Sequence, residues 1–218
     1  MHNIVNNFIS IQDEIKKNSP LIHQNINIIA VSKTFSHDHI KPLIDHGHNH
    51  FGENKVQEAL DKWEKTKNLN KNLNLHLIGK LQTNKVKIAV KLFDYIHSLD
   101  NTKLANKIAS EQTKLEKKVK IFIQVNIGDE NQKNGINKNE LLEFYNYCSK
   151  DLNLNIIGLM CIPPNENNSK TFFTEMKILN ESIGLDNLSM GMSNDYIDAV
   201  NSGSNFLRIG SKIFGSRN

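Results

Sequence analysis

A lysine closes the first apolar run of the chain, INIIAVSK over residues 26–33. The ammonium group of Lys33 at the end of a buried strand must be desolvated or paired. Desolvation lowers the pKa of a lysine amine, and the neutral amine can form a Schiff base with a carbonyl compound. The alternative is a lysine whose charged end reaches solvent at the rim of the fold. Lys33 alone does not distinguish a reactive amine from a surface charge.

Glycine and serine residues follow two later apolar runs, in SMGMSND (189–195) and RIGSKIFGSR (208–217). Where such a segment opens a helix, free backbone N–H groups and neighbouring hydroxyls bind phosphate. Taken singly, Ser193 is also a reasonable helix N-cap and Gly210 a tight turn. Together with Lys33, the two segments describe an aldehyde-reactive amine beside a phosphate site. Pyridoxal 5′-phosphate (PLP) requires that combination.

Eight apolar runs of strand length position these residues. The runs are rich in β-branched or aromatic residues and cover residues 26–33, 48–54, 75–79, 95–99, 119–127, 155–162, 188–192 and 206–210. Segments with helical spacing lie between them, for example 55–67, 101–118 and 137–150. An amphipathic helix is also expected before the first strand, where Ile4, Phe8, Ile11 and Ile15 share one face.

Strict alternation of strands and helices predicts an α/β fold with a parallel sheet, and eight repeats close a (β/α)8 barrel. An open doubly wound sheet has the same local pattern, but no GxGxxG motif opens the first helix. We therefore expect a single-domain TIM barrel over residues 1–218, with an extra N-terminal helix over 1–20 and the barrel over 26–218. Binding residues of such a barrel lie at the C-terminal ends of its strands.

Composition narrows the class of protein. The chain has 218 residues, of which 38% are hydrophobic and 23% charged, enough to bury a sizeable core. It has no apolar run of roughly 18 residues and no signal-peptide core, and Cys148 and Cys161 form no disulfide framework. A cytoplasmic protein without a membrane span is expected. The net charge of +4 comes from dispersed residues, which argues against dedicated nucleic-acid binding.

Five of the nine histidines, His37, His39, His46, His48 and His50, lie within one short segment. If residues 46–50 formed a strand, three imidazoles would share one face and could bind zinc. However, a glycine interrupts this segment, and no HExxH motif or cysteine accompanies it. We therefore expect a solvated loop and no metal site.

Seven blocks of the sequence resemble the pyridoxal phosphate homeostasis protein family. They are AVSK (30–33), FGENKVQE (51–58), HLIGKLQTNK (76–85), VNIGDENQKNG (125–135), GLMCIP (158–163), SMGMSNDYIDAV (189–200) and RIGSKIFGSR (208–217). The blocks occur in family order and span the chain from about residue 26 to its end. The resemblance implies a barrel similar to the N-terminal domain of alanine racemase, with PLP held as an internal aldimine on Lys33.

The resemblance also implies roles for five further cofactor-binding residues. Asn54 is the expected polar neighbour of the PLP ring, and Ser193, Gly210 and Ser211 match the phosphate-binding positions. Arg208 is expected to face the pyridine nitrogen. Because arginine cannot accept a proton, that nitrogen stays unprotonated, and the ring is a poorer electron sink than it is beside an aspartate.

Two functions are compatible with such a site. The first is a PLP-binding protein of intracellular vitamin B6 homeostasis, which buffers PLP or delivers it to PLP-dependent apo-enzymes. The second is a PLP-dependent amino-acid racemase or lyase. Two-base racemization needs a proton donor on each face of the cofactor, and the alanine-racemase type takes its second base from a C-terminal domain of a partner subunit. Eight strand–helix units leave no room for that domain in 218 residues, so we expect a monomeric carrier without catalytic residues.

Overall fold

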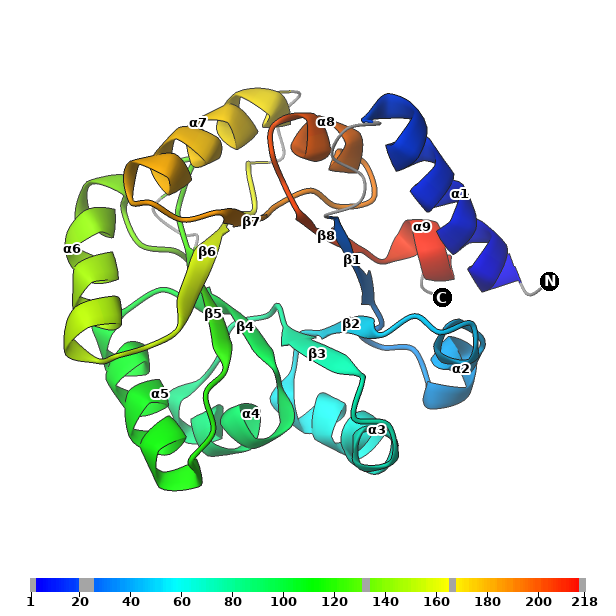
Figure 1. Cartoon of the computed structure of the whole chain (residues 1–218), viewed down its shortest axis with the longest axis horizontal. Helices are drawn as coiled ribbons and strands as arrows, with labels where there is room; N and C mark the ends of the chain where they lie inside the picture. Colours follow the sequence, from blue (N-terminus) through cyan, green and yellow to red (C-terminus); the bar gives the residue numbers. More distant parts are fainter. Residues whose placement is uncertain (1–2, 20–25, 131–133, 165–167, 216–218) are drawn as a thin grey trace.

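The computed structural model describes residues 3–19, 26–130, 134–164 and 168–215. Eight parallel strands close into one barrel in chain order, and β8 pairs with β1 (Figure 1). The strands are β1 (Asn27–Val31), β2 (His50–Glu53), β3 (Asn74–Leu77), β4 (Tyr95–Leu99), β5 (Lys120–Gln124), β6 (Ile156–Met160), β7 (Asn187–Ser189) and β8 (Phe206–Ile209). Each of the eight predicted apolar runs overlaps one strand, so the predicted (β/α)8 barrel is confirmed.

Helices surround the barrel on its outside (Figure 1). They are α1 (Asn3–Asn18), α2 (His37–Asp45), α3 (Val56–Leu69), α4 (Val86–Leu92), α5 (Thr102–Leu115), α6 (Leu141–Asn146), α7 (Ser169–Ser182), α8 (Tyr196–Asn201) and α9 (Ser211–Phe214), with short 3₁₀ turns η2 (Thr83–Lys85) and η3 (Lys138–Glu140). The predicted N-terminal helix is confirmed over Asn3–Asn18, while residues 1–2 and 20 of its predicted span lie outside the described residues. No helix in the described part of the chain is both long and apolar enough to cross a membrane.

The segment after β5 departs from the single helix expected over 137–150. Helix α6 ends at Asn146 and continues as the π-helical turn η4 (Tyr147–Asp151). The hydroxyl of Ser149 donates to the carbonyl of Tyr145 at 2.7 Å. A hydroxyl bound to the carbonyl four residues earlier competes with the helical ladder and favours a wider turn.

Two apolar clusters form the core. The larger one fills the space between the barrel and its helices, and the side chains of Trp63, Phe93 and Phe173 in it are fully buried. The smaller one consists of alternate strand residues, namely Ile29, Tyr95, Phe122, Met160 and Phe206. Because successive side chains of a strand point to opposite faces, this second cluster fills the inside of the barrel.

Helix α1 supports the C-terminal end of the chain (Figure 1). Its apolar face, which includes Phe8 and Ile11, is buried, and the Asn7 amide donates to the carbonyl of Ile213 at 3.0 Å. Glu14 accepts from the Tyr196 hydroxyl at 2.6 Å and pairs with Lys212 Nζ at 2.9 Å. Helix α1 therefore holds α8 and α9, whose first residues follow the ends of β7 and β8.

Candidate functional site

Lys33 lies in the turn that follows β1, and its side chain is half-buried. The next residue, Thr34, has a φ of 70°, a left-handed conformation that is costly for a β-branched residue. The backbone N–H of Thr34 donates to Glu58 Oε1 at 2.6 Å. Strained backbone of this kind persists where surrounding contacts impose it, and such positions cluster at functional sites.

The residue before Lys33 is tied to a buried ion pair. Glu53 is fully buried at the end of β2, and its Oε1 atom accepts from the Ser32 hydroxyl at 2.8 Å and the Trp63 indole at 2.9 Å. Lys62 Nζ lies 2.9 Å from the same oxygen and also donates to the carbonyl of Ser32 at 2.8 Å. The backbone on both sides of Lys33 is thus held by acidic residues of β2 and α3.

This ion-pair network did not follow from the sequence. Glu58 and Lys62 have the i, i+4 spacing of a helical ion pair, and their charged atoms lie 3.7 Å apart. The part played by Glu53 depends on how α3 packs against β1 and β2, which no local spacing reveals. The shared contact with Lys62 joins Glu53 and Glu58 in one structural network.

Two predicted phosphate-binding hydroxyls lie together. The Ser211 hydroxyl donates to Ser193 Oγ at 3.1 Å, although 18 positions separate the two residues. The backbone N–H of Lys212 also donates to Ser193 Oγ, at 3.3 Å. Ser211 is exposed and Ser193 is half-buried. An anion could accept from both hydroxyls once the Ser211 O–H turns from Ser193 Oγ to the anion.

Two glycines allow this close approach. Gly191 has a φ of 89°, and a Cβ atom there would lie 2.5 Å from the Cβ of Ala199, so only glycine fits. Its carbonyl accepts from the backbone N–H of Arg208 at 3.0 Å, which fixes the loop after β7 to β8. A Cβ atom on Gly210 would lie 3.4 Å from Val31. The serine pair is therefore next to β1, the strand that leads to Lys33.

Arg208 is a buried cation on β8, with 5% of its surface exposed. Its guanidinium donates to Ser189 Oγ and to the carbonyl of Cys161, both at 2.8 Å. Burial lowers the pKa of Arg208, yet arginine remains charged in proteins. Burial also raises the pKa of the Cys161 thiol to about 12, so this cysteine is a protonated packing residue.

Asn54 lies one strand away from Lys33, since β2 pairs with β1. It follows β2 and is half-buried, and a Cβ atom on Gly79 would lie 2.3 Å from its carbonyl oxygen. Asn54 lines a pocket of about 390 Å³ together with Lys80 and Lys85. Within the described residues, no hydrogen bond joins its side chain to Arg208 or to the serine pair.

The prediction of a solvated histidine loop is wrong for four of its five members, since His37 and His39 lie in helix α2. His48 and His50 are half-buried, because Gly47 (φ 95°) turns the chain after α2 back toward the barrel. The His48 ring packs on Phe8 at a centroid distance of 4.5 Å. No group of three or more His, Cys, Asp or Glu residues suited to a metal ion occurs in the described ranges.

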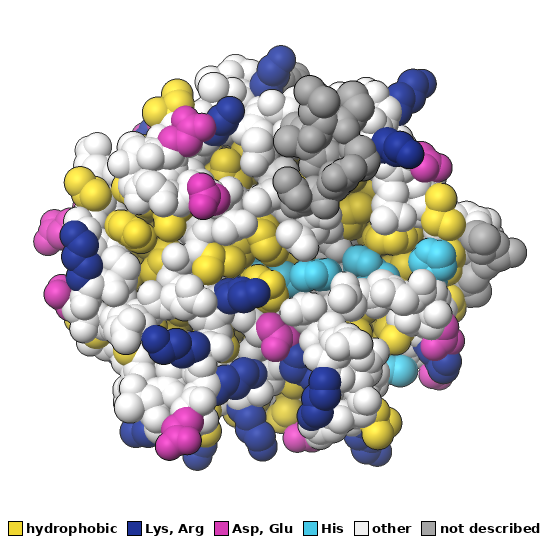
Figure 2. All heavy atoms as spheres, viewed as in Figure 1, with side chains coloured by type: hydrophobic (Ala, Val, Ile, Leu, Met, Phe, Trp, Pro, Cys, Tyr) yellow, Lys and Arg dark blue, Asp and Glu magenta, His cyan; other side chains and the backbone are white. Residues whose placement is uncertain are grey.

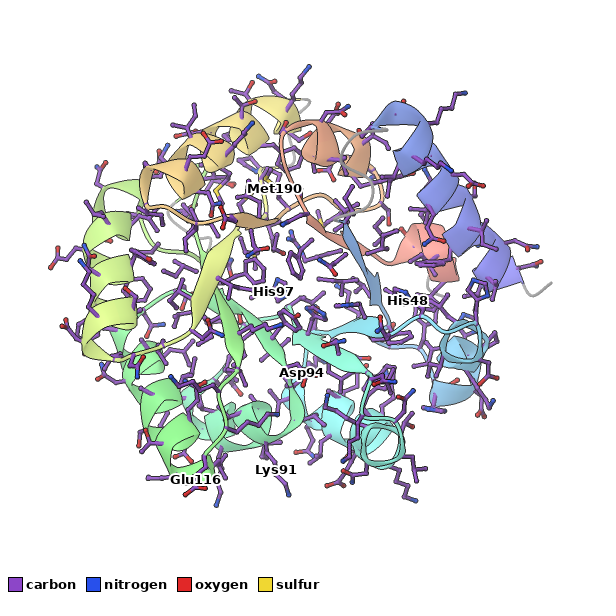
Figure 3. All side chains as sticks on the ribbon, in the orientation of Figure 1. His48, Lys91, Asp94, His97, Glu116 and Met190 are labelled. Atoms are coloured by element: carbon purple, nitrogen blue, oxygen red, sulfur yellow. The ribbon has the colours of Figure 1, made fainter. Side chains whose placement is uncertain are left out.

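Histidines of three neighbouring strands form a row inside the barrel. His50 Nδ1 lies 2.9 Å from His76 Nε2, and His76 Nδ1 lies 2.9 Å from His97 Nε2. His97 Nδ1 then lies 2.8 Å from Ser189 Oγ, which also contacts Arg208. His97 is enclosed by the ring of strands (Figure 3). Sequence reasoning missed this row, although His76 is the single polar residue of the run LHLIG (75–79) and His97 lies in the apolar run YIHSL (95–99).

The buried histidines predict a loss of stability in mild acid. Burial lowers the pKa of His76 and His97 well below 6.5, and the charge of Arg208 acts in the same direction on His97. Below pH 6.5 the unfolded chain therefore binds protons that the folded chain does not. Stability is fully present above this pH and is lost as the pH falls, by about 1.4 kcal/mol per pH unit for each such histidine.

Chemical denaturation between pH 7.5 and 4.5 measures this slope. The pKa of His48 is lowered by burial to about 4, and a His48→Gln variant keeps a donor for the carbonyl of His50, which the ring contacts at 2.8 Å. We expect this variant to have a shallower slope than the unmodified chain. A free energy of unfolding that stays constant from pH 6.5 to 5 would contradict the prediction.

The sequence is similar to known proteins over most of its length. The family model of the alanine racemase N-terminal domain matches residues 10–218. The pyridoxal phosphate homeostasis protein of Pasteurella multocida is 36% identical over 202 residues, which cover 88% of this chain and 87% of that protein. The protein of the same name from Escherichia coli K12 is 34% identical, with 100% of this chain and 98% of that protein covered.

A solved structure shows the same likeness in three dimensions. The structure of PipY from Synechococcus elongatus with PLP bound superposes with a TM-score of 0.81 at 31% sequence identity. The match covers 92% of this chain and 100% of the PipY chain.

Proposed function

We propose that this chain, which belongs to the pyridoxal phosphate homeostasis protein family, binds PLP at the C-terminal ends of its barrel strands and buffers or delivers it. The observation that carries this proposal is the pair of hydroxyls on Ser193 and Ser211, 3.1 Å apart beside the end of β1. Two hydroxyls that can donate to phosphate, near a strand-end lysine and a buried arginine, suit the three polar parts of PLP. When bound, PLP supplies an electrophilic aldehyde and a ring that accepts electron density.

Lys33 is the proposed point of covalent attachment. It lies two residues after the end of β1, at the C-terminal end of the barrel strands, and is half-buried. The contacts of Ser32 with Glu53 and of Thr34 with Glu58 hold the backbone on either side of it. These contacts limit the freedom of the lysine and direct its amine to one place.

Ser193, Gly210 and Ser211 are the proposed phosphate site. A hydroxyl bound to a charged phosphate contributes about 1.5–3 kcal/mol, so a Ser193→Ala/Ser211→Ala double variant should bind PLP at least ~100-fold more weakly. Titration of the apo-protein with PLP, followed by absorbance, measures this affinity. Ser182→Ala, which removes an exposed hydroxyl on α7, is the matched control and should bind like the unmodified chain. Equal affinity in the double variant would rule out this phosphate site.

Arg208 is proposed to face the pyridine nitrogen of PLP, with Asn54 beside the ring. A guanidinium donates a hydrogen bond and leaves the nitrogen unprotonated, so negative charge at the substrate carbon is poorly stabilised. This supports a carrier without appreciable turnover rather than a racemase or lyase. Racemization of alanine or serine much faster than with free PLP, and lost in Lys33→Ala, would contradict the carrier function.

Location and partners are part of the same proposal. We propose a cytoplasmic monomer that donates PLP to PLP-dependent apo-enzymes. Both cysteines are free and buried, which suits a reducing compartment. The most exposed large apolar side chains, Leu69, Leu142 and Ile178, lie on the separate helices α3, α6 and α7. Single apolar residues of this kind do not make a dimer interface.

A further inference from the structure

We propose that His50, His76, His97 and Ser189 form a polarised hydrogen-bond relay that crosses the barrel and positions Arg208 for the pyridine nitrogen of PLP. The inference rests on the proposed function for its link to PLP, whereas the relay itself is a property of the chain alone. These four residues act through Arg208 and are positioning residues.

The relay runs from the N-terminal mouth of the barrel to its cofactor end. His50 is the first residue of β2, and Ser189 is the last residue of β7. The donor–acceptor distances between consecutive side chains are 2.9, 2.9 and 2.8 Å, and a further 2.8 Å joins Ser189 Oγ to Arg208. Four hydrogen bonds of ordinary length thus connect five side chains without a gap.

The hydrogen-bonding chemistry of Arg208 and Ser189 sets the direction in which the relay donates. A guanidinium can only donate, so Ser189 Oγ must accept from Arg208. Ser189 Oγ could also accept from His97, but its own buried hydroxyl proton would then have no acceptor among the contacts of Ser189 Oγ with His97 and Arg208. The hydroxyl therefore donates to His97 Nδ1, at 2.8 Å. A neutral imidazole carries one donor and one acceptor. Each ring therefore accepts at Nδ1 and donates from Nε2, His97 to His76 and His76 to His50.

Neighbouring aromatic rings hold the imidazoles in this order. Tyr95 stacks on His76 at 4.2 Å with an interplanar angle of 13°, and Phe122 stacks on His97 at 4.4 Å with an angle of 22°. Stacked rings cannot turn freely, which keeps the ring nitrogens in line. Phenylalanine would fill the same space without burying polar nitrogens, so packing alone does not explain two imidazoles with no exposed surface.

The relay also stabilises the buried positive charge of Arg208. Among the described residues, no carboxylate lies within ion-pair distance of this buried guanidinium. A buried charge without a counter-ion needs oriented dipoles to replace its hydration. In the polarity derived above, every member of the relay turns its accepting atom toward Arg208. The negative ends of four dipoles then point at the cation.

The far end of the relay reaches the surface of the barrel. His50 is half-buried, and histidine side chains are visible across the middle of the face drawn in Figure 2. Lys120 and Asp94 are the charged residues that act on His50 there, in opposite directions on its pKa. Lys120 also donates to the Tyr95 hydroxyl at 3.0 Å. The Nε2–H group of His50 can therefore donate a hydrogen bond to water at this mouth.

Nitrogen-15 NMR of the histidine rings tests the polarity in the PLP-free chain at pH 7.5. We expect His76 and His97 to carry their ring protons on Nε2, with hydrogen-bonded, unprotonated Nδ1 atoms. Ser189→Ala should shift the resonances of His97 and also those of His76, which does not touch the serine. The control Ser149→Ala removes a half-buried hydroxyl that donates to the carbonyl of Tyr145, and it should leave both rings unchanged. A proton on Nδ1 of His97 would overturn the relay.

PLP binding tests the positioning of Arg208. Ser189→Ala removes the hydroxyl that orients the charged Arg208. It should weaken PLP affinity by roughly 10-fold or more and shift the absorption maximum of the bound cofactor. Ser189→Thr, which keeps the hydroxyl, should restore the maximum, and Ser149→Ala should not move it. If Ser189→Ala keeps the affinity and spectrum of the unmodified chain, the relay does not position Arg208.

The two measurements separate this inference from the proposed function. Failure of the unmodified chain to bind PLP would contradict the proposed function and with it the link between Arg208 and the cofactor. The ring tautomers of the PLP-free chain would still decide whether the relay is polarised from Arg208 toward His50. If Ser189→Ala does not fold, the tautomers of the unmodified chain still test the polarity of the relay, and the spectrum of Ser189→Thr still tests the positioning of Arg208.

Discussion

Replacing Glu53 with alanine is expected to lower the free energy of unfolding by about 3–5 kcal/mol, because the substitution removes the nearest carboxylate of the buried Lys62 and leaves it the more distant Glu58, at 3.7 Å. The Lys62 side chain is only 8% exposed and lies 2.9 Å from the Glu53 carboxylate. The same substitution removes the acceptor of Ser32 and of the Trp63 indole. Urea denaturation at pH 7.5 measures the change.

Two variants control this prediction. Asp45→Ala breaks an ion pair with Lys41 in which both side chains are more than half exposed, and such pairs contribute less than about 1 kcal/mol. Glu53→Gln keeps an oxygen for Ser32 and Trp63 but loses the charge, so its loss should lie between those of Glu53→Ala and Asp45→Ala. A loss in Glu53→Ala no larger than in Asp45→Ala would show that the network does not stabilise the fold.

Replacing Lys33 with alanine is expected to abolish the visible absorption of lysine-bound PLP and to reduce the PLP retained after gel filtration at least ~10-fold. The residue lies in a turn outside β1, so the thermal unfolding midpoint should change little. The matched control is Lys55→Ala, which removes an exposed lysine just before α3, near the same end of the barrel. It should retain PLP, and equal retention in both variants would place the covalent bond on another amine.

The barrel could be predicted from the sequence because its signal is local and repeated. Runs such as Ile28–Val31, with β-branched residues between turn residues, mark each strand, and eight of them alternate with helical segments. Lys33 closes the first of these runs. Because an eight-stranded barrel closes by pairing its last strand with its first, the same pattern also predicts that Arg208 and Ser211, on and after β8, lie beside β1.

The histidine row could not be predicted because its members come from three strands and touch only in the closed barrel. The sequence predicts a solvated loop around His50, because Gly47 interrupts the segment and no cysteine or HExxH motif accompanies it. The structure buries it because β2 begins at His50 and pairs with β3. A histidine between apolar residues, as in the runs of His76 and His97, was the available signal of an inward-facing polar group.

The contacts of Glu53 and Ser189 depend on tertiary packing in the same way. The carboxylate of Glu53 meets Ser32, 21 positions away, and Ser189 meets His97, 92 positions away. No spacing rule for a helix or a strand reaches that far. Residues with a local role, such as Ser193 and Gly210 in loops after strands, were the ones that sequence reasoning could assign.

Borohydride reduction followed by peptide mass mapping tests the central claim most directly. The chain purified with PLP is reduced, digested and searched for a pyridoxyl adduct on each lysine. The account predicts one major adduct on Lys33, in the peptide that contains AVSK, and its absence in Lys33→Ala. A major adduct on another lysine, or none in the PLP-loaded chain, would contradict the assignment of Lys33 as the PLP-binding residue.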